Sequence, residues 1–360
     1  MLLLNPGPVT LSERVRRSML APDLCHRESE FFDLQDEARE RLLAVYGLDA
    51  AEWCAVLLTA SGTGAVESMV STLVPQDGRV LVVENGVYGE RIAQICARYR
   101  ISFARMTGDW MAPLDLAGIA RRIESAPQEG DGRFTHIAVV HHETTTGRLN
   151  DLPALGDLCR RHGVKLLLDA VSSFGAEALD FADDSLVGLA ATANKCLHGV
   201  PGVAFAIARR RALERAMSRT YYLDLARCAA AQDRRDTPFT PAVQACYALV
   251  EALREHAEQG GREARHARYD ALAERVRAGF AKLGIAPMLP PAESSVVLRS
   301  YRLPAGVSYA KLHDGLKEQG FVIYAGQGNL SEKLFRISTM GDVSTADIDR
   351  LLECCGDLLR

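Results

Sequence analysis

The sequence predicts an α/β protein with a mostly parallel sheet that helices cover on both faces. Short aliphatic runs alternate with helical stretches over residues 55–210, and this order is typical of parallel sheets. Two of the runs, 166–168 and 186–193, are followed by Asp169 and Lys195, which have chemical uses. The length of 360 residues is sufficient for two domains.

The composition is that of an ordinary globular protein, with 48% hydrophobic and 24% charged residues. A net charge of −4 gives no reason to expect nucleic acid or an acidic membrane as a partner. No apolar stretch has the length of a membrane span, and the first residues lack the pattern of a signal peptide. The nine cysteines are scattered without metal-ligand spacing. We therefore expect a cytoplasmic protein with reduced thiols and no metal site.

The most informative pair is Asp169 and Lys195, each placed where a predicted buried strand ends. Neighbouring strand ends meet at the edge where open α/β sheets bind ligands. A lysine that forms a Schiff base, with an aspartate against a pyridinium nitrogen, is the pair that pyridoxal phosphate requires. From these two residues alone, the alternative remains open that they are an exposed lysine and a strand-end aspartate that never meet.

The first strand–helix unit contains a small-residue turn. A strand over 55–59 is followed by Ser61, Gly62 and Thr63, and then by a helix whose apolar residues recur at 66, 69, 70 and 73. Free backbone N–H groups and two hydroxyls at a helix start can cradle a phosphate. Such a turn can also be only a helix cap. The turn is neither a Walker loop nor GxGxxG, which argues against nucleoside triphosphates and dinucleotides.

Three further side chains invite a functional interpretation. Tyr88 follows the strand predicted over 79–84 and could stack on a flat ring, or be an ordinary half-buried tyrosine. Thr144 follows the strand predicted over 136–141, where its hydroxyl could bond a phenolic oxygen or close a turn. Arg336 is surrounded by apolar residues, so it either pairs with an acid or holds an anionic group of a substrate.

The N-terminal segment adds three candidates. Gly7 lies in a proline-rich arm and permits close approach of the backbone. His26 and Arg27 precede a charged helix that extends to about residue 46. They could hold a dianion, or they could be paired surface charges at a helix start.

The rest of the chain predicts a second, smaller α+β domain. A basic, irregular passage over 209–235 leads to a helix over 242–259, and the glycine pair at 260 and 261 marks the boundary. We predict a large α/β domain over 16–258 and a small domain formed by 1–15 plus 259–360. The elements that follow are expected as a strand over 295–300, a helix over 309–319, strands over 321–324 and 334–338, and a helix over 346–359 that starts at a capping box, residues 344–347.

Taken together and in this order, the motifs resemble those of the class V branch of the fold-type I pyridoxal-phosphate transaminases. The likeness covers nearly the whole chain. It is carried by residues 5–8, 25–28, 61–63, 85–89, 143–147, 169–173, 194–196, 199–202, 320–324 and 335–337. The resemblance implies a mostly parallel sheet of the seven-stranded type, flanked by helices, with a smaller C-terminal α+β domain.

The resemblance also implies pyridoxal 5'-phosphate as the cofactor and gives residues their roles. Lys195 would hold the cofactor covalently, and Asp169 would contact the pyridinium nitrogen. Tyr88 would stack on the ring, and Thr144 would lie near its phenolic oxygen. The other cofactor-binding residues implied are Ser61, Gly62 and Thr63 at the phosphate, together with Val171 and Asn194.

Substrate and subunit contacts follow from the same likeness. Arg336 would bind the substrate anion, with Gly7, His26 and Arg27 beside it. Thr240 matches a position that reaches the cofactor phosphate of a neighbouring subunit, which implies a homodimer with shared active sites.

The expected reaction is transamination between a small amino donor and a 2-oxo acid. Within the family, we expect 2-aminoethylphosphonate and pyruvate to give phosphonoacetaldehyde and L-alanine. The alternatives are another class V transaminase, of the alanine–glyoxylate, serine–glyoxylate or phosphoserine type, and a pyridoxal-phosphate-binding protein without turnover.

Overall fold

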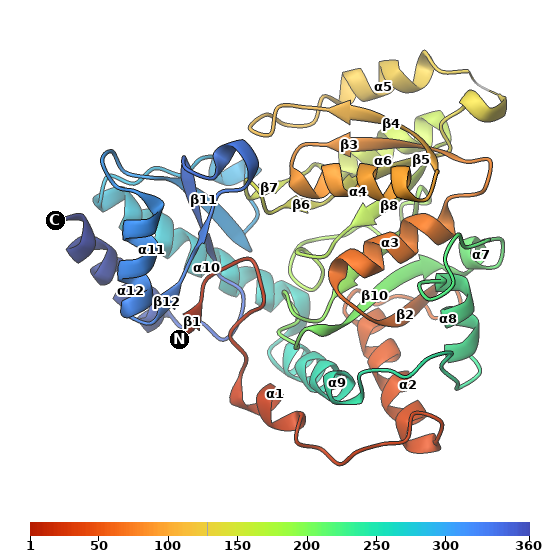
Figure 1. Ribbon diagram of the computed structural model, residues 1–360, viewed down its shortest axis with the longest axis horizontal. Helices are drawn as coiled ribbons and strands as arrows, with labels where there is room; N and C mark the ends of the chain where they lie inside the picture. The colour runs from red at the N-terminus through yellow and green to blue at the C-terminus, as the bar shows by residue number, and fades with distance from the viewer. Residues whose placement is uncertain (128) are drawn as a thin grey trace.

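The computed structural model describes residues 1–127 and 129–360 (Figure 1). Its largest feature is a seven-stranded sheet with the strand order β2-β10-β9-β8-β5-β3-β4. Neighbouring strands are parallel except at β10, which is antiparallel to both β2 and β9. The strands are β2 (Trp53–Ala60), β3 (Arg79–Glu84), β4 (Ser102–Thr107), β5 (His136–Val140), β8 (Lys165–Asp169), β9 (Leu186–Thr192) and β10 (Gly202–Arg209). The predicted fold class is confirmed.

Both faces of this sheet are buried except at the edge strand β4, which is partly exposed, because alternate residues of the other strands enter different hydrophobic clusters. In β8, Leu166 and Leu168 belong to one cluster and Leu167 to the other. This explains the uninterrupted aliphatic runs in the sequence, since a strand covered on both sides has no solvent face. The helices of this part of the chain are α1 (Glu13–Ser18), α2 (Ser29–Ala44), α3 (Gly62–Leu73), α4 (Val87–Arg98), α5 (Leu116–Glu124), α6 (Leu152–His162), α7 (Arg210–Leu213), α8 (Leu225–Gln232) and α9 (Val243–Glu258).

The C-terminal part forms smaller sheets beside the long helix α10 (Gly261–Lys282), to one side of the large sheet in Figure 1. One sheet has the order β11-β14-β13, and in the other β1 pairs in parallel with β12. A third hydrophobic cluster lies here and includes Leu4 from the N-terminus. The division of the chain at residues 15 and 258 stays a prediction, and this cluster is consistent with it. The remaining elements are β1 (Leu2–Leu3), β6 (His142–Glu143), β7 (Arg148–Leu149), η1 (Gly130–Gly132), η2 (Pro291–Glu293), β11 (Leu298–Arg302), α11 (Tyr309–Glu318), β12 (Phe321–Val322), β13 (Tyr324–Ala325), η3 (Gly328–Leu330), β14 (Leu334–Ser338) and α12 (Thr345–Leu359).

Three expected elements differ from the structure. The strand expected over 295–300 begins only at Leu298, because the N–H groups of Ser295 and Val296 bond outside the sheet, to the Gly147 carbonyl and the Glu177 carboxylate. The strand expected over 321–324 is two short strands in different sheets, β12 against β1 and β13 against β14.

The passage over 209–235 is not irregular, since it contains α7 and α8. The side chain of Asp224 caps α8 by accepting a hydrogen bond from the N–H of Arg227. The expected capping box at Ser344 and Asp347 is confirmed. Within the part of the chain that the structure describes, no helix combines the length and apolarity that crossing a bilayer requires.

Candidate active site

The edge of the large sheet brings Asp169 and Lys195 together. Asp169 is the last residue of β8 and pairs with Ala190 of β9, and Lys195 follows shortly after β9 ends. Their opposite charges interact, since each stabilises the charged form of the other. This interaction argues against the alternative in which the two never meet.

One cavity of about 390 Å³ collects most of the predicted cofactor residues. Its walls include Ser61, Gly62, Thr63, Tyr88, Val171, Asn194 and Lys195. A smaller adjoining cavity shares Thr63, Tyr88 and Val171 with it and contains Asp169. The oxygen of the Asn194 side chain accepts a hydrogen bond of 2.8 Å from the Thr192 hydroxyl, which fixes the turn before Lys195.

Lys195 is partly buried, and desolvation lowers the pKa of its amine to about 8, with Arg336 and Arg91 acting in the same direction. Its Nζ donates a hydrogen bond to the carbonyl of Pro6. The N-terminal arm passes so close that a Cβ atom on Gly7 would lie 2.7 Å from Nζ. Gly7 also has a φ of +109°, which L side chains rarely adopt, so glycine is needed there on both grounds.

Asp169 is 6% exposed, and burial raises the pKa of its carboxyl to about 6. Three interactions oppose that rise. Oδ1 accepts a hydrogen bond of 2.9 Å from the N–H of Val171, and the cations Arg91 and Lys195 favour the carboxylate. The acid is therefore placed to exchange a proton with a basic group near neutral pH.

The turn before α3 has the features of an anion cradle. Ser61 occupies the N-cap of α3, but its hydroxyl makes no capping bond, so it is available to a ligand. A Cβ on Gly62 would lie 2.8 Å from a methyl group of Val171, so only glycine lets the turn pass there. The hydroxyl of Thr63 accepts a hydrogen bond of 3.0 Å from Arg91. A helix start, two hydroxyls and a guanidinium suit a phosphate.

Arg91 and Glu143 are site residues that the sequence interpretation missed. The guanidinium of Arg91 lies 4.7 Å from the centre of the Tyr88 ring. Spacing could have indicated Arg91, because residues three apart share a helix face. Glu143 is fully buried and accepts hydrogen bonds from Thr145 N–H, from the Thr145 hydroxyl and, at 3.3 Å, from Tyr88 N–H. Burial raises the pKa of Glu143 to about 7, and this side chain secures the start of α4, where Tyr88 lies.

Arg336 lies in β14 and is 2% exposed. Its Nε donates to the Ala325 carbonyl at 2.8 Å, and its Nη1 donates to the Thr144 carbonyl at 2.9 Å and to Gln327 Oε1 at 3.2 Å. Over residues 1–127 and 129–360, no carboxylate forms an ion pair with Arg336. Of the two interpretations of this arginine, the structure favours the anion-binding one over the salt bridge. Thr144 is buried and contacts Arg336 through its carbonyl.

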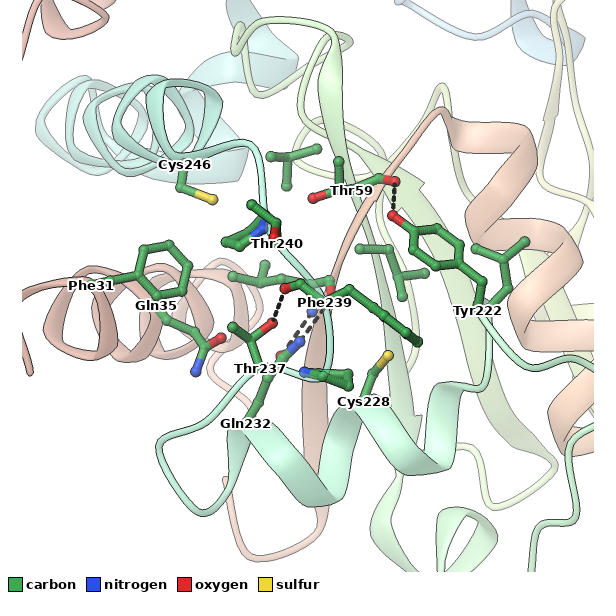
Figure 2. A pocket seen from close by; sticks show the side chains of 16 residues that line it. Phe31, Gln35, Thr59, Tyr222, Cys228, Gln232, Thr237, Phe239, Thr240 and Cys246 are labelled. Atoms are coloured by element: carbon green, nitrogen blue, oxygen red, sulfur yellow. Dashed lines mark hydrogen bonds between the residues drawn. The ribbon is translucent and has the colours of Figure 1, made fainter. Parts of the chain in front are cut away.

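Seven predicted residues do not line the Lys195 cavity: Gly7, Thr144, Asp169 and Arg336, described above, and His26, Arg27 and Thr240. Arg27 is exposed, with its guanidinium 3.8 Å from the Asp236 carboxylate, and its neighbour His26 is partly exposed. Thr240 is exposed and lines a separate, mostly apolar pocket with Phe239, shown in Figure 2. Thr59 lines both this pocket and the Lys195 cavity, which makes the two neighbours.

These features fit pyridoxal phosphate. They combine an amine of lowered pKa, a buried carboxyl, an aromatic ring and a cradle that an added Cβ atom would fill. The described residues contain no group of three or more His, Cys, Asp or Glu side chains placed to hold a metal ion. The fold and site together define a pyridoxal-phosphate-dependent aminotransferase.

Comparison with known proteins gives the family. Residues 16–351 match the model of the class-V aminotransferases, and the chain belongs to that family. A 2-aminoethylphosphonate–pyruvate transaminase from Pseudomonas aeruginosa is 35% identical, over 100% of this chain and 96% of the relative. Another from Bacillus cytotoxicus is 36% identical, over 99% and 97%.

Solved structures agree with the family assignment. An alanine–glyoxylate aminotransferase from Nostoc sp. superimposes with a TM-score of 0.91 at 25% identity, covering 100% of this chain and 95% of that one. An aspartate aminotransferase from Thermus thermophilus gives 0.88 at 28%, covering 100% and 99%. The protein is a transaminase that acts on an amino donor and a 2-oxo acid, with pyridoxal phosphate as its cofactor.

Proposed function

We propose that this enzyme transfers the amino group of 2-aminoethylphosphonate to pyruvate, giving phosphonoacetaldehyde and L-alanine. The observation that carries the proposal is the full-length similarity to transaminases named for this reaction, at 35–36% identity. The buried guanidinium of Arg336, which has no carboxylate partner among the described residues, supports an anionic substrate.

The same proposal assigns the cofactor site. Lys195 would hold the cofactor covalently, and Asp169 would hold its ring nitrogen. Tyr88 would cover the ring, with Thr144 near the phenolic oxygen. The phosphate would be held by Ser61, Gly62 and Thr63, with Val171 and Asn194 shaping the wall. To these we add Arg91, because its guanidinium already donates to Thr63.

When bound, the cofactor supplies an electron sink for the pair released as the substrate carbon loses its proton. Asp169 would contribute a negative charge at a buried position. Burial destabilises this carboxylate and raises its pKa, so a cationic partner there would stabilise it. Lys195 contributes a base, since a pKa of about 8 leaves a useful neutral fraction of its amine near neutral pH. Its Nζ would accept the proton from the substrate carbon and then deliver it to the cofactor carbon.

Arg336 would orient the substrate by its anionic end, phosphonate in the first half-reaction and carboxylate in the second. A planar guanidinium suits both groups, because both present oxygens in pairs. Gly7 would let the N-terminal arm close over Lys195, since no side chain intervenes. Such closure helps to exclude water from the reacting amine.

We further propose a cytoplasmic homodimer with shared active sites. The exposed Thr240, in a pocket adjoining the Lys195 cavity, supports a contact with a neighbouring subunit. His26 and Arg27 stand outside the cavity of their own chain, so any role at an anion would be in a partner's site. Sedimentation of the purified enzyme at micromolar concentration tests the dimer.

A donor panel tests the substrate. Purified enzyme loaded with pyridoxal phosphate is mixed with pyruvate and one amino donor at a time: 2-aminoethylphosphonate, serine or phosphoserine. In a further reaction, alanine is the donor and glyoxylate replaces pyruvate. We expect L-alanine and phosphonoacetaldehyde to form fastest from 2-aminoethylphosphonate. A faster reaction with another donor would overturn the proposed substrate, and absence of turnover with every donor would favour a binding protein.

A further inference from the structure

We propose that Gln327 is a further substrate-binding residue that completes the anion subsite together with Arg336. The inference rests on the proposed function, which places the substrate anion at Arg336. Gln327 immediately precedes η3 in the connection between β13 and β14, and one hydrogen bond joins its side chain to Arg336 of β14. That bond of 3.2 Å runs from Arg336 Nη1 to Gln327 Oε1.

Hydrogen-bond accounting shows which donors remain. A guanidinium has five N–H groups. Nε uses one on the Ala325 carbonyl, and Nη1 uses two on Thr144 and Gln327. The two N–H groups of Nη2 have no acceptor among the described residues. Arg336 is only 2% exposed, but Nη2 is not among the buried atoms that lack a partner, so this nitrogen faces accessible space where an anion can reach it.

Gln327 adds hydrogen-bond donors beside the guanidinium of Arg336. Its amide oxygen faces Arg336 as an acceptor, so its NH₂ group is the end left over. No described residue accepts a hydrogen bond from that NH₂ group. Arg336 Nη2 and Gln327 Nε2 therefore form a donor pair that can share the oxygens of one anion.

The turn that carries Gln327 is fixed by close packing. A Cβ on Gly326 would lie 2.1 Å from the Leu330 carbonyl oxygen, and a Cβ on Gly328 would lie 3.0 Å from the Trp110 ring. Leu330 N–H donates to the Gln327 carbonyl at 3.1 Å. The backbone of the turn is thus fixed before substrate arrives, and the bond from Arg336 orients the Gln327 amide, which lowers the entropic cost of binding.

The net charge of this subsite determines how tightly it binds a phosphonate relative to a carboxylate. Gln327 gives hydrogen bonds without charge, so the Arg336–Gln327 pair carries a single positive charge. A carboxylate has one negative charge, whereas a phospho group near pH 7 has between one and two. The neutral amide therefore serves carboxylate and phosphonate alike, as a two-substrate transamination requires. A lysine at position 327 would shift the balance toward the phosphonate.

The test compares Gln327→Leu and Gln327→Lys with the wild type in each half-reaction. The conversion of bound cofactor is followed by absorbance against the concentration of 2-aminoethylphosphonate, and of pyruvate with the aminated enzyme. We expect Gln327→Leu to raise the apparent dissociation constant of both substrates about 10-fold. We expect Gln327→Lys to bind the phosphonate several-fold more tightly relative to pyruvate.

The exposed neighbour Asn329, in the same turn, gives the control variant Asn329→Leu, which should match the wild type. Unchanged binding of both substrates by Gln327→Leu, in protein with a wild-type melting temperature, would overturn the role of Gln327. Failure of the wild type to react with 2-aminoethylphosphonate would instead overturn the proposed donor. In that case the pyruvate half-reaction still decides the role of Gln327.

Discussion

The two sides of the active site differ in how their charges are balanced. At the edge of the large sheet, the Asp169 carboxylate interacts with the cations Lys195 and Arg91. At the small sheet, Arg336 is held by two carbonyls and an amide, with no carboxylate paired to it among the described residues. The first arrangement shifts the pKa values of Asp169 and Lys195, and the second leaves a positive charge that, in the proposed function, would hold the substrate anion.

Removing the Lys195 amine should abolish activity completely. Lys195→Ala deletes both the covalent attachment point and the proposed base, so transamination should fall to background in a coupled alanine assay. Lys165→Ala, which removes an exposed lysine at the start of β8, should leave activity unchanged. Retained turnover by Lys195→Ala would refute the role given to this residue.

Replacing the buried Asp169 carboxyl with a neutral amide should lower activity and raise the stability of the apoprotein. Asp169→Asn should lower kcat by on the order of 100-fold, because the cofactor nitrogen loses its anionic partner. The same change should stabilise the apoprotein at pH 7. The Asp169 pKa is raised to about 6 in the folded state, so the folded protein binds more protons than the unfolded one.

The sign of the pH effect follows from that shift. The contribution of Asp169 to stability is lost as pH rises from about 4 to 6, and it amounts to at most about 3 kcal/mol. Urea unfolding of the cofactor-free protein at pH 4.5 and pH 7 measures it. An Asp169→Asn variant no more stable than wild type at pH 7 would contradict this account.

On the substrate side, Arg336→Lys should weaken both half-reactions. An ammonium group keeps the charge but cannot bond the Ala325 and Thr144 carbonyls while presenting a fork to the anion. We expect kcat/KM to fall about 10- to 100-fold for phosphonate and for pyruvate. Arg302→Lys, at the exposed end of β11, is the matched control. Equal kinetics in all three proteins would remove Arg336 from the substrate site.

The smallest effect concerns the pH at which the cofactor attaches. Only the neutral amine of Lys195 is a nucleophile, and its fraction increases as pH rises through its pKa of about 8. The rate of colour formation in apoprotein mixed with pyridoxal phosphate should rise up to about 10-fold per pH unit and level off above about pH 8. A rate that still climbs at pH 10 would indicate an ordinary lysine.

The cofactor side was largely predictable from the sequence because its signals are local. Asp169 ends a buried strand, Ser61 and Tyr88 come after two others, and parallel strands bring their carboxyl ends to one edge. The substrate side was predictable only at Arg336, whose apolar surroundings marked it as unusual. Gln327 has no local signal, since its importance comes from one contact across nine positions of chain.

By itself, the sequence determined the α/β class, the edge of the sheet where chemistry occurs, and the likeness to class V transaminases. These depend on short-range periodicity and on residues that follow strands directly. Only the tertiary structure decided that Glu143 bonds the backbone N–H of Tyr88 and that Arg336 has no carboxylate partner among the described residues. Those facts depend on which distant segments pack together, and burial changes pKa values only once that packing exists.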